Sequence, residues 1–263
     1  MNRINKTALV TGASTGIGNE LSRLLAQDGY NLVLIARDEE KLKKLSIELE
    51  EKYNIFAKVI AKDLSMPNSP QEIFKETQEQ ELNISVLINN AGYGSFGEFL
   101  DLQIENEINM LQVNILSLTN LTYLYGKEMI KMGGGKILNV SSTAAFQPGP
   151  LMTVYYASKA YVLHFSEALA NELKNKNITV TTLCPGPTKT NFQQRAEMLE
   201  SKLVNGKRIM NAALVAAEGY KGMKAGRTLV IPGIQNKMLS IGVKLLPRGM
   251  VTKFVRSIQE SRK

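Results

Sequence analysis

The stretch "VYYASKAYV" (154–162) places two adjacent tyrosines four and three residues before Lys159. Residues three or four apart share one face of a helix, so this spacing predicts that the Lys159 ammonium lies beside the phenol of Tyr155 or Tyr156. A phenol has a pKa of about 10, and a neighbouring cation stabilises its phenolate form. Such a tyrosine can exchange the proton that accompanies reduction of a carbonyl group or oxidation of an alcohol. Helical spacing alone does not choose between the two tyrosines.

A hydroxyl donor beside the reacting oxygen would complete a site of this kind. The apolar run that precedes the tyrosines ends in "NVSS", which offers Ser141 and Ser142. Both serines are candidates at this point.

A glycine-rich turn, "TGASTGIG" (11–18), follows the first apolar run and precedes an amphipathic helical pattern. Glycines at positions 12, 16 and 18 allow the backbone to approach a pyrophosphate, and the N-terminus of the next helix offers free N–H groups. Because the turn joins a strand pattern to a helix pattern, it predicts nucleotide binding.

The second apolar run, "NLVLIA" (31–36), is followed by Arg37 and not by an acidic residue. A guanidinium suits a ribose 2′-phosphate, whereas an acidic side chain suits a free 2′-hydroxyl, so NADP(H) is favoured over NAD(H). The alternative is a solvated arginine at the start of an exposed helix. Asp38 and the two glutamates that follow are attributed to stabilisation of that helix's first turn. Asp63 and "NNAG" (89–92) follow the next two runs and are expected at the adenine and ribose side of the same cleft.

Seven short apolar runs alternate with helical patterns, which predicts an α/β fold: a single doubly wound Rossmann-type domain with a central parallel sheet of about seven strands and helices on both faces. The expected strands are 7–11, 31–36, 55–61, 84–89, 135–141, 178–184 and 227–232, and the expected helices include 17–28, 38–53, 104–132 and 156–176. In such a sheet, ligands bind beyond the carboxyl ends of the strands, where the residues above are found.

The chain has 263 residues with one cysteine and one histidine, too few for an intramolecular disulfide or for a zinc or haem site, so no metal is expected. Both Cys184 and His164 are expected to pack in the core. The sequence shows neither a signal peptide nor an apolar run long enough to span a membrane, which indicates a cytoplasmic protein.

Positive charge is concentrated at the end of the chain, where residues 237–263 hold seven Lys or Arg and only Glu260. This confinement argues against nucleic-acid binding, which would need a basic groove with stacking aromatic residues. We therefore expect a catalytic domain at 1–236, with a substrate loop at about 187–207, followed by a basic amphipathic tail. The tail is expected to pack over the pocket or across a subunit interface; peripheral contact with an anionic membrane surface is the alternative.

The ordered set "TGASTGIG", "NNAG", Asn114 in "LQVNILSLT", Ser142, "YYASK" and "PGPTKT" (185–190) resembles the short-chain dehydrogenase/reductase family over about residues 5–232. The resemblance implies the pattern Tyr-x-x-x-Lys, with Tyr155 as general acid/base and Lys159 binding the nicotinamide ribose and lowering the tyrosine pKa. It further implies that Ser142 steadies the substrate oxygen and that Asn114 holds a relay water. Homodimers or homotetramers are expected from the family. The implied cofactor contacts are Gly12, Ser14, Thr15, Gly16, Ile17, Gly18, Arg37, Asp63, Leu64, Asn90, Ala91, Gly92, Tyr155, Lys159, Pro185, Gly186, Thr188 and Thr190.

These observations predict an NADP(H)-dependent oxidoreductase that interconverts a ketone and a secondary alcohol. A bulky apolar substrate, 3-ketoacyl or hydroxysteroid-like, is indicated by apolar side chains in the loops after the strands: Tyr93, Phe96, Phe99, Phe146, Leu151, Met152, Phe192, Met198 and Leu199. The alternative is a catalytically inactive nucleotide-sensing or scaffold protein on the same fold. Such a protein is expected to have lost at least one of the four catalytic candidates, and all four are present.

Overall fold

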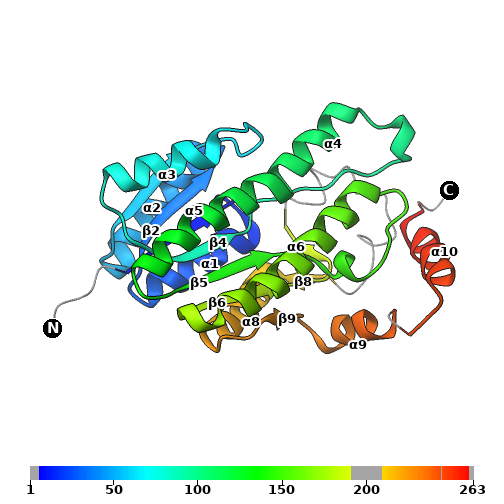
Figure 1. The fold of residues 1–263 in the computed structure, drawn as a ribbon. Coiled ribbons are helices and arrows are strands. Elements are labelled where there is room, and N and C mark those ends of the chain that lie inside the picture. The colour runs from blue at the N-terminus through cyan, green and yellow to red at the C-terminus, as the bar shows by residue number, and fades with distance from the viewer. Residues whose placement is uncertain (1–5, 191–208, 244, 261–263) are drawn as a thin grey trace.

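Seven parallel strands form one sheet in the order β3-β2-β1-β4-β5-β6-β9, in a computed structural model that describes residues 6–190, 209–243 and 245–260 (Figure 1). The strand order reverses between β1 and β4, so the predicted doubly wound Rossmann-type fold is confirmed. The strands are β1 (Thr7–Thr11), β2 (Asn31–Ala36), β3 (Ala57–Ala61), β4 (Ile84–Asn89), β5 (Gly135–Val140), β6 (Ile178–Leu183) and β9 (Leu229–Val230). A separate parallel pair joins β7 (Thr188–Lys189) to β8 (Met210–Asn211).

Helices cover both faces of the sheet. One face packs against α1 (Gly16–Gln27), α2 (Glu39–Tyr53) and α8 (Ala212–Lys224), and the other against α3 (Ser69–Glu79), α5 (Leu118–Lys131) and α6 (Thr153–Glu172). Successive strand side chains point to opposite faces, so Ala8 and Val10 enter the first layer while Leu9 enters the second. Burial on both sides explains why the strand sequences are apolar throughout and not alternating.

The expected helix 104–132 is interrupted by a π-helical turn at Gln112–Ser117, which separates α4 (Ile104–Leu111) from α5. Ser117 anchors the turn, because its hydroxyl donates to the Leu64 carbonyl at 2.7 Å. Apolar periodicity predicted the helical span correctly but not the π-helical turn within it, since the pattern does not register one additional residue per turn. Such turns are frequent at functional sites.

The cysteine and the histidine differ in burial, although both were expected in the core. Cys184 is completely buried beside Leu163, as expected, and burial raises its pKa to about 12. The prediction that His164 packs in the core is wrong: its side chain is 77% exposed and lies 3.9 Å from Glu167. Val162, Leu163 and Ser166 face inward on α6, which leaves His164 on the outward side.

Two helices end the described chain, α9 (Ile234–Gly242) and α10 (Arg248–Gln259). Figure 1 shows them at the end of the molecule opposite the N-terminus, beyond the last strand of the sheet. Among the described residues there are also three short 3-10 helices, at Phe99–Asp101, Thr143–Phe146 and Lys174–Lys176. Every helix in the described ranges is too short or too polar to span a lipid bilayer.

Candidate active site

A cavity of about 1380 Å³ lies at the carboxyl ends of the strands. Its wall extends from the glycine-rich turn after β1 to the C-terminal helix α10, so residues from the two ends of the described chain meet around one space. Of the residues expected at a site, the wall includes Gly12, Ser14, Thr15, Gly16, Ile17, Arg37, Asp63, Leu64, Asn90, Ala91, Gly92, Ser142, Tyr155, Lys159, Pro185, Gly186, Thr188 and Thr190. Gly18 and Asn114 do not line the cavity.

The turn between β1 and α1 depends on its glycines. Gly12 and Gly16 have φ values of +67° and +60°, a left-handed backbone that other residues adopt only with strain. A Cβ on Gly18 would collide with the Gly12 carbonyl oxygen and the Asn90 side-chain amide. Gly18 therefore does not face the cavity, and its lack of a side chain allows the Gly12 carbonyl and the Asn90 side chain to pack closely against α1. Thr15, at the N-cap of α1, makes no side-chain cap bond, and the first turn of α1 has no acidic residue, an arrangement suited to an anionic phosphate.

Hydrogen bonds join the ends of β1 and β4. The Thr11 hydroxyl donates to the Ile88 carbonyl at 3.2 Å and accepts from the backbone N–H groups of Asn90 and Ala91, each at 3.0 Å. The Asn90 side chain donates to the carbonyls of Thr11 and Gly12 at 3.0 and 3.2 Å. These bonds fix the glycine-rich turn against the "NNAG" turn, so the two face the cavity as one rigid edge.

Arg37 stands at the cavity wall with 59% of its side chain exposed, and its Nη1 lies 3.8 Å from Asp63 Oδ2. Asp38 does not compete for this guanidinium, because it caps α2: its carboxylate accepts from the backbone N–H of Lys41 at 3.1 Å and from the Lys41 ammonium at 2.5 Å. This is the helix-stabilising role expected of Asp38. The Arg37 guanidinium remains accessible to an anion at the cavity edge.

Asn114 is buried in the π-helical turn, where it ties three elements together. Its Nδ2 donates to the Tyr93 carbonyl and to the Ser158 hydroxyl, both at 3.0 Å, while its Oδ1 accepts from the Tyr93 N–H at 3.2 Å. The loop after β4 and helix α6 are thus held at fixed positions relative to the turn.

Lys159 is also buried, and its ammonium donates to the Val140 carbonyl at 3.0 Å. Burial lowers the Lys159 pKa to about 8. A Cβ on Gly92 would lie 3.2 Å from Lys159 Nζ and 3.0 Å from Asn114 Oδ1. The two polar groups therefore converge on Gly92, where only a hydrogen occupies the side-chain position.

The two tyrosines have different polar partners. The phenol of Tyr155 is hydrogen-bonded with Ser142, whereas the phenol of Tyr156 accepts from Gln259 Nε2 at 2.7 Å. Their rings meet edge to face with centroids 6.0 Å apart. Burial raises the pKa of both phenols, that of Tyr156 to about 12. The expected lowering of the Tyr155 pKa does not occur in the protein by itself, because burial outweighs the opposing effect of the Ser142 bond.

The two serines at the end of β5 are likewise distinguished. Ser141 donates its hydroxyl to the Lys159 carbonyl at 2.7 Å, which fixes the backbone of α6. Ser142 begins the 3-10 helix, and its Oγ accepts from the Ala144 N–H at 3.1 Å while remaining in contact with Tyr155. Ser142 is the serine positioned to act on a bound molecule.

The structure also brings in cavity residues that were not predicted individually. From α9, its C-cap Val243 and α10, these are Asn236, Leu239, Ser240, Val243, Phe254, Val255, Ile258 and Gln259. Val251 and Val255 pack in one buried cluster with Met110, Met152, Tyr155 and Tyr156. The expectation that the tail packs over the pocket is therefore confirmed for α10. The sequence feature that predicted this packing is the apolar face of 250–258, but the sequence alone does not indicate which surface this face covers.

The loop residues expected to form an apolar pocket contribute unequally. Tyr93 and Met152 line the cavity. Phe96 and Phe146 pack against neighbouring buried clusters, and Phe99 is 43% exposed. Leu151 does not line the cavity. Phe192, Met198 and Leu199 lie outside the described residues, as does most of the expected substrate loop 187–207. The apolar wall thus comes largely from the C-terminal helices.

Comparison with known proteins gives a consistent result. The model of the short chain dehydrogenase family matches residues 6–200. The very-long-chain 3-oxoacyl-CoA reductase of Rattus norvegicus is 38% identical over 187 residues, which cover 70% of this chain. The match spans 59% of that reductase.

Two solved structures are similar over nearly the whole chain. A short-chain dehydrogenase from Sphingobium yanoikuyae in complex with NADPH has a TM-score of 0.83 and 27% identity, with 98% of each chain covered. The bulky-bulky ketone specific alcohol dehydrogenase from Comamonas testosteroni has a TM-score of 0.77 and 29% identity, with 91% of this chain and 93% of the other covered.

Proposed function

The chain belongs to the short-chain dehydrogenase family, and on that premise we propose that it is an NADP(H)-dependent oxidoreductase that interconverts a ketone and a secondary alcohol on a bulky apolar substrate. The main support for this proposal is the hydrogen-bonded pair of Tyr155 and Ser142 at the cavity wall. Tyr156, the adjacent phenol, is held by Gln259 instead.

In this proposal the side chains act on the substrate oxygen and its proton. Ser142 donates a hydrogen bond to the oxygen and orients it toward Tyr155. The phenol of Tyr155 gives its proton to the oxygen during reduction and takes it back during oxidation. Lys159 stabilises the resulting phenolate, and Asn114 orients a water that exchanges protons with Lys159 near Gly92. A site buried to this degree also excludes bulk water from the reaction.

The residues at the other end of the cavity fit a nicotinamide dinucleotide phosphate. The turn 12–18 and the N-terminus of α1 suit the pyrophosphate, Arg37 suits the 2′-phosphate, and Asp63, Leu64 and the "NNAG" turn suit the adenosine. Pro185, Gly186, Thr188 and Thr190 would contact the nicotinamide end, and the Cβ position left open by Gly92 allows close approach beside Lys159. When bound, NADPH supplies the hydride and NADP⁺ accepts it.

The apolar cavity wall supports a bulky substrate. Leu239, Val243, Phe254, Val255 and Ile258 line the end of the cavity that the C-terminal helices cover. The names of the rat reductase and of the Comamonas enzyme point to long acyl and bulky ketone substrates, respectively. The chain spans less than two thirds of the rat reductase, so 3-ketoacyl thioesters and oxosteroids are proposed here as classes to test.

An NADPH-oxidation screen tests the proposal, with 3-ketoacyl thioesters, oxosteroids and bulky aromatic ketones as substrates and acetone as the small control. We expect turnover with at least one bulky class and much less with acetone. Binding of NADPH without oxidation by any of these ketones, and without reduction of NADP⁺ by the matching alcohols, would favour the inactive nucleotide-sensing alternative.

Arg37→Asp tests the cofactor preference. Loss of charge-assisted hydrogen bonds, each about 1.5–3 kcal/mol, predicts roughly ten- to hundred-fold weaker NADPH binding with little change for NADH. Lys43→Asp is the matched control, because Lys43 carries the same charge on α2, pairs with Glu39 and does not line the cavity. Equal losses for both cofactors on Arg37→Asp would contradict the assignment.

A further inference from the structure

The segment from 219 to 259 contains no acidic residue. Over these residues the chain has eight cations, namely Lys221, Lys224, Arg227, Lys237, Lys244, Arg248, Lys253 and Arg256. The second half of this segment forms α9 and α10, so a one-signed stretch of charge coincides with the helices that wall the cavity.

The same helices and the connection between them expose large apolar side chains. Ile234 is 80% exposed, Met238 68%, Leu245 82% and Met250 61%. We call the exposed set the C-terminal apolar face, which comprises Ile234, Met238, Leu239, Ile241, Leu245, Leu246, Met250 and Phe254. A concentration of large exposed apolar side chains within one short segment is typical of an interaction site.

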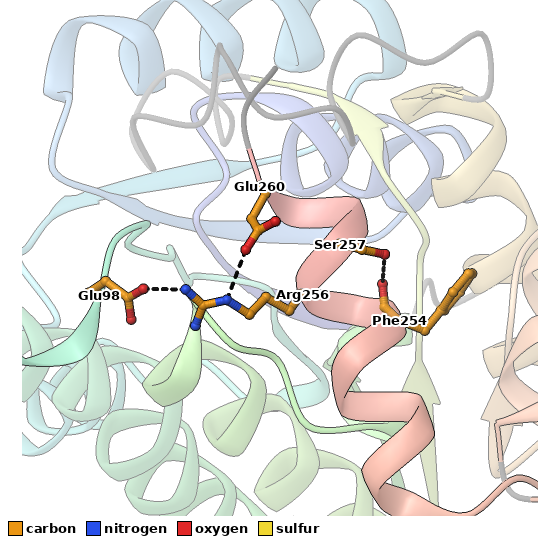
Figure 2. Close-up of polar contacts among 5 residues, drawn as sticks. All are labelled: Glu98, Phe254, Arg256, Ser257 and Glu260. Carbon is orange, nitrogen blue, oxygen red and sulfur yellow. Dashed lines mark hydrogen bonds and ion pairs between the residues drawn. The ribbon is translucent and has the colours of Figure 1, made fainter. Parts of the chain in front are cut away.

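This face is not free to turn inward, because the other side of α10 is already engaged. Arg256 binds Glu98 at 2.5 Å and Glu260 at 2.9 Å, and in Figure 2 Phe254 points to the opposite side of the helix from this pair. Gln259 bonds to Tyr156, and Val251 and Val255 are buried. The fold therefore holds α10 with Val251 and Val255 inward and with Met250 and Phe254 exposed.

Cations accompany this face without compensation by carboxylates. Lys237, Arg248 and Lys253 are exposed, and none of them makes an ion pair within the part of the chain that the structure describes. Apolar side chains flanked by unpaired cations are complementary to a surface that is apolar inside and negatively charged at its boundary.

The face reaches the cavity itself. Leu239 and Phe254 are 57% and 58% exposed, and both also line the cavity. An apolar molecule bound at the C-terminal apolar face is thus in contact with the same side chains that form the cavity rim.

From exposure, charge and this shared rim, we propose that the C-terminal apolar face docks on the surface of an anionic lipid bilayer, with the cavity rim toward the lipid. Docking stands on exposure and charge alone; passage of an apolar substrate from the lipid into the cavity rests on the proposed function as well. A second copy of the chain is the poorer occupant, because a symmetric contact through this face would bring two sets of unpaired cations together.

Docking is tested by sedimentation of the full chain with vesicles of two compositions: phosphatidylcholine alone, and phosphatidylcholine with about 30% phosphatidylserine. We expect binding to the anionic vesicles, weaker binding at high salt, and little binding to the neutral ones. The double variant Met238→Glu/Met250→Glu removes apolar contacts with the lipid and adds negative charge, so it is expected to lower the vesicle partition at least tenfold. Neither position lines the cavity, so the variant leaves the cavity wall unchanged.

The matched control is Ile47→Glu/Leu214→Glu, which makes the same changes at positions 55% and 62% exposed on α2 and α8. It should bind vesicles as the wild type does. Absence of wild-type binding, equal binding to neutral vesicles, or equal loss in the control would overturn the proposal, as would a change of oligomeric state in the Met238/Met250 variant alone. Turnover of a water-soluble ketone without vesicles should be unchanged in both variants, so failure of docking and failure of the proposed activity give separate readouts.

Discussion

The cavity has two walls that are constructed differently. The strand-end wall consists of the turns after β1, β4 and β5, where backbone geometry and buried hydrogen bonds such as those of Thr11 fix each residue. The C-terminal wall consists of α9 and α10; α10 is held by the burial of Val251 and Val255 and by one buried bond from Gln259.

This contrast teaches how tolerance is distributed around one site. In the strand-end wall, a Cβ added at Gly12 or Gly18 meets backbone atoms and the Asn90 side-chain amide, which have little room to adjust. In the C-terminal wall, most contacts are apolar and one-sided, so a side chain can change with a local effect on the cavity's shape. We expect effects on rate and cofactor affinity from the first wall and effects on substrate selection from the second.

The largest effect is expected from Tyr155→Phe, which removes the proposed proton donor from the strand-end wall. General acid/base catalysis contributes about 10²–10⁴-fold, so kcat for ketone reduction should fall by that range while NADPH binding, measured by fluorescence titration, changes little. Tyr156→Phe is the matched control, with a much smaller loss of kcat. The reverse ranking would place the acid/base on Tyr156 and break the distinction between the walls.

Gly18→Ala is next in size. The new Cβ would meet the Gly12 carbonyl and Asn90, and overpacking of this kind typically costs about 1–3 kcal/mol of folding free energy. Denaturant unfolding with and without NADPH should show lower stability and weaker cofactor binding. Gly126→Ala on α5 is the control, because a Cβ there meets no atom within 4 Å; it should stabilise the helix by about 0.5–1 kcal/mol. Equal outcomes would show that the turn is less rigid than its contacts indicate.

Gln259→Met tests the C-terminal wall. It removes the bond to Tyr156, worth about 1 kcal/mol, while retaining the shape of the side chain. A double-mutant cycle with Tyr156→Phe should give a coupling energy of that order in unfolding experiments. KM for a bulky ketone should rise more than kcat falls, and NADPH affinity should stay constant. A loss in kcat alone would mean that the C-terminal wall positions the catalytic groups directly.

Arg256→Gln should have the smallest effect. The ion pair with Glu98 joins α10 to the loop after β4, but both side chains are about half exposed, and exposed pairs contribute little to stability. The unfolding midpoint should stay within experimental error, with no dependence on salt beyond that of the wild type. A marked loss would show that charge, and not burial of Val251 and Val255, holds the C-terminal wall in place.

The strand-end wall was largely predictable from the sequence because it depends on local rules. Apolar runs gave β1, β2 and β4 with correct bounds, and glycines at 12 and 16 do adopt the left-handed conformations that such a turn requires. The resemblance to a family supplied the choice of Tyr155 over Tyr156, which periodicity left open. The different partners of the two phenols agree with that choice but required the fold to be seen.

The C-terminal wall could not be predicted in this way, because it depends on contacts between distant parts of the chain. An amphipathic pattern at 250–258 shows that one face is buried without saying against what, so three locations for the tail remained open. Gln259 could not be assigned to Tyr156 across 103 residues of sequence. His164 was misplaced for a related reason: a helical pattern with apolar residues on several sides does not reveal which side faces the sheet.

The π-helical turn at Gln112–Ser117 has a consequence for chain length. A turn closed by i to i+5 bonds holds one more residue than a turn closed by i to i+4 bonds. A deletion of one residue here would therefore let α4 and α5 join as a regular helix, with Met110 and Leu121 still directed to their core positions, but without the widened turn that presents Asn114 to Tyr93 and Ser158. The fold therefore does not require the additional residue of the π-helical turn, whereas the position of Asn114 in the site does. A relative shorter by one residue here would keep the fold and lose this position of Asn114.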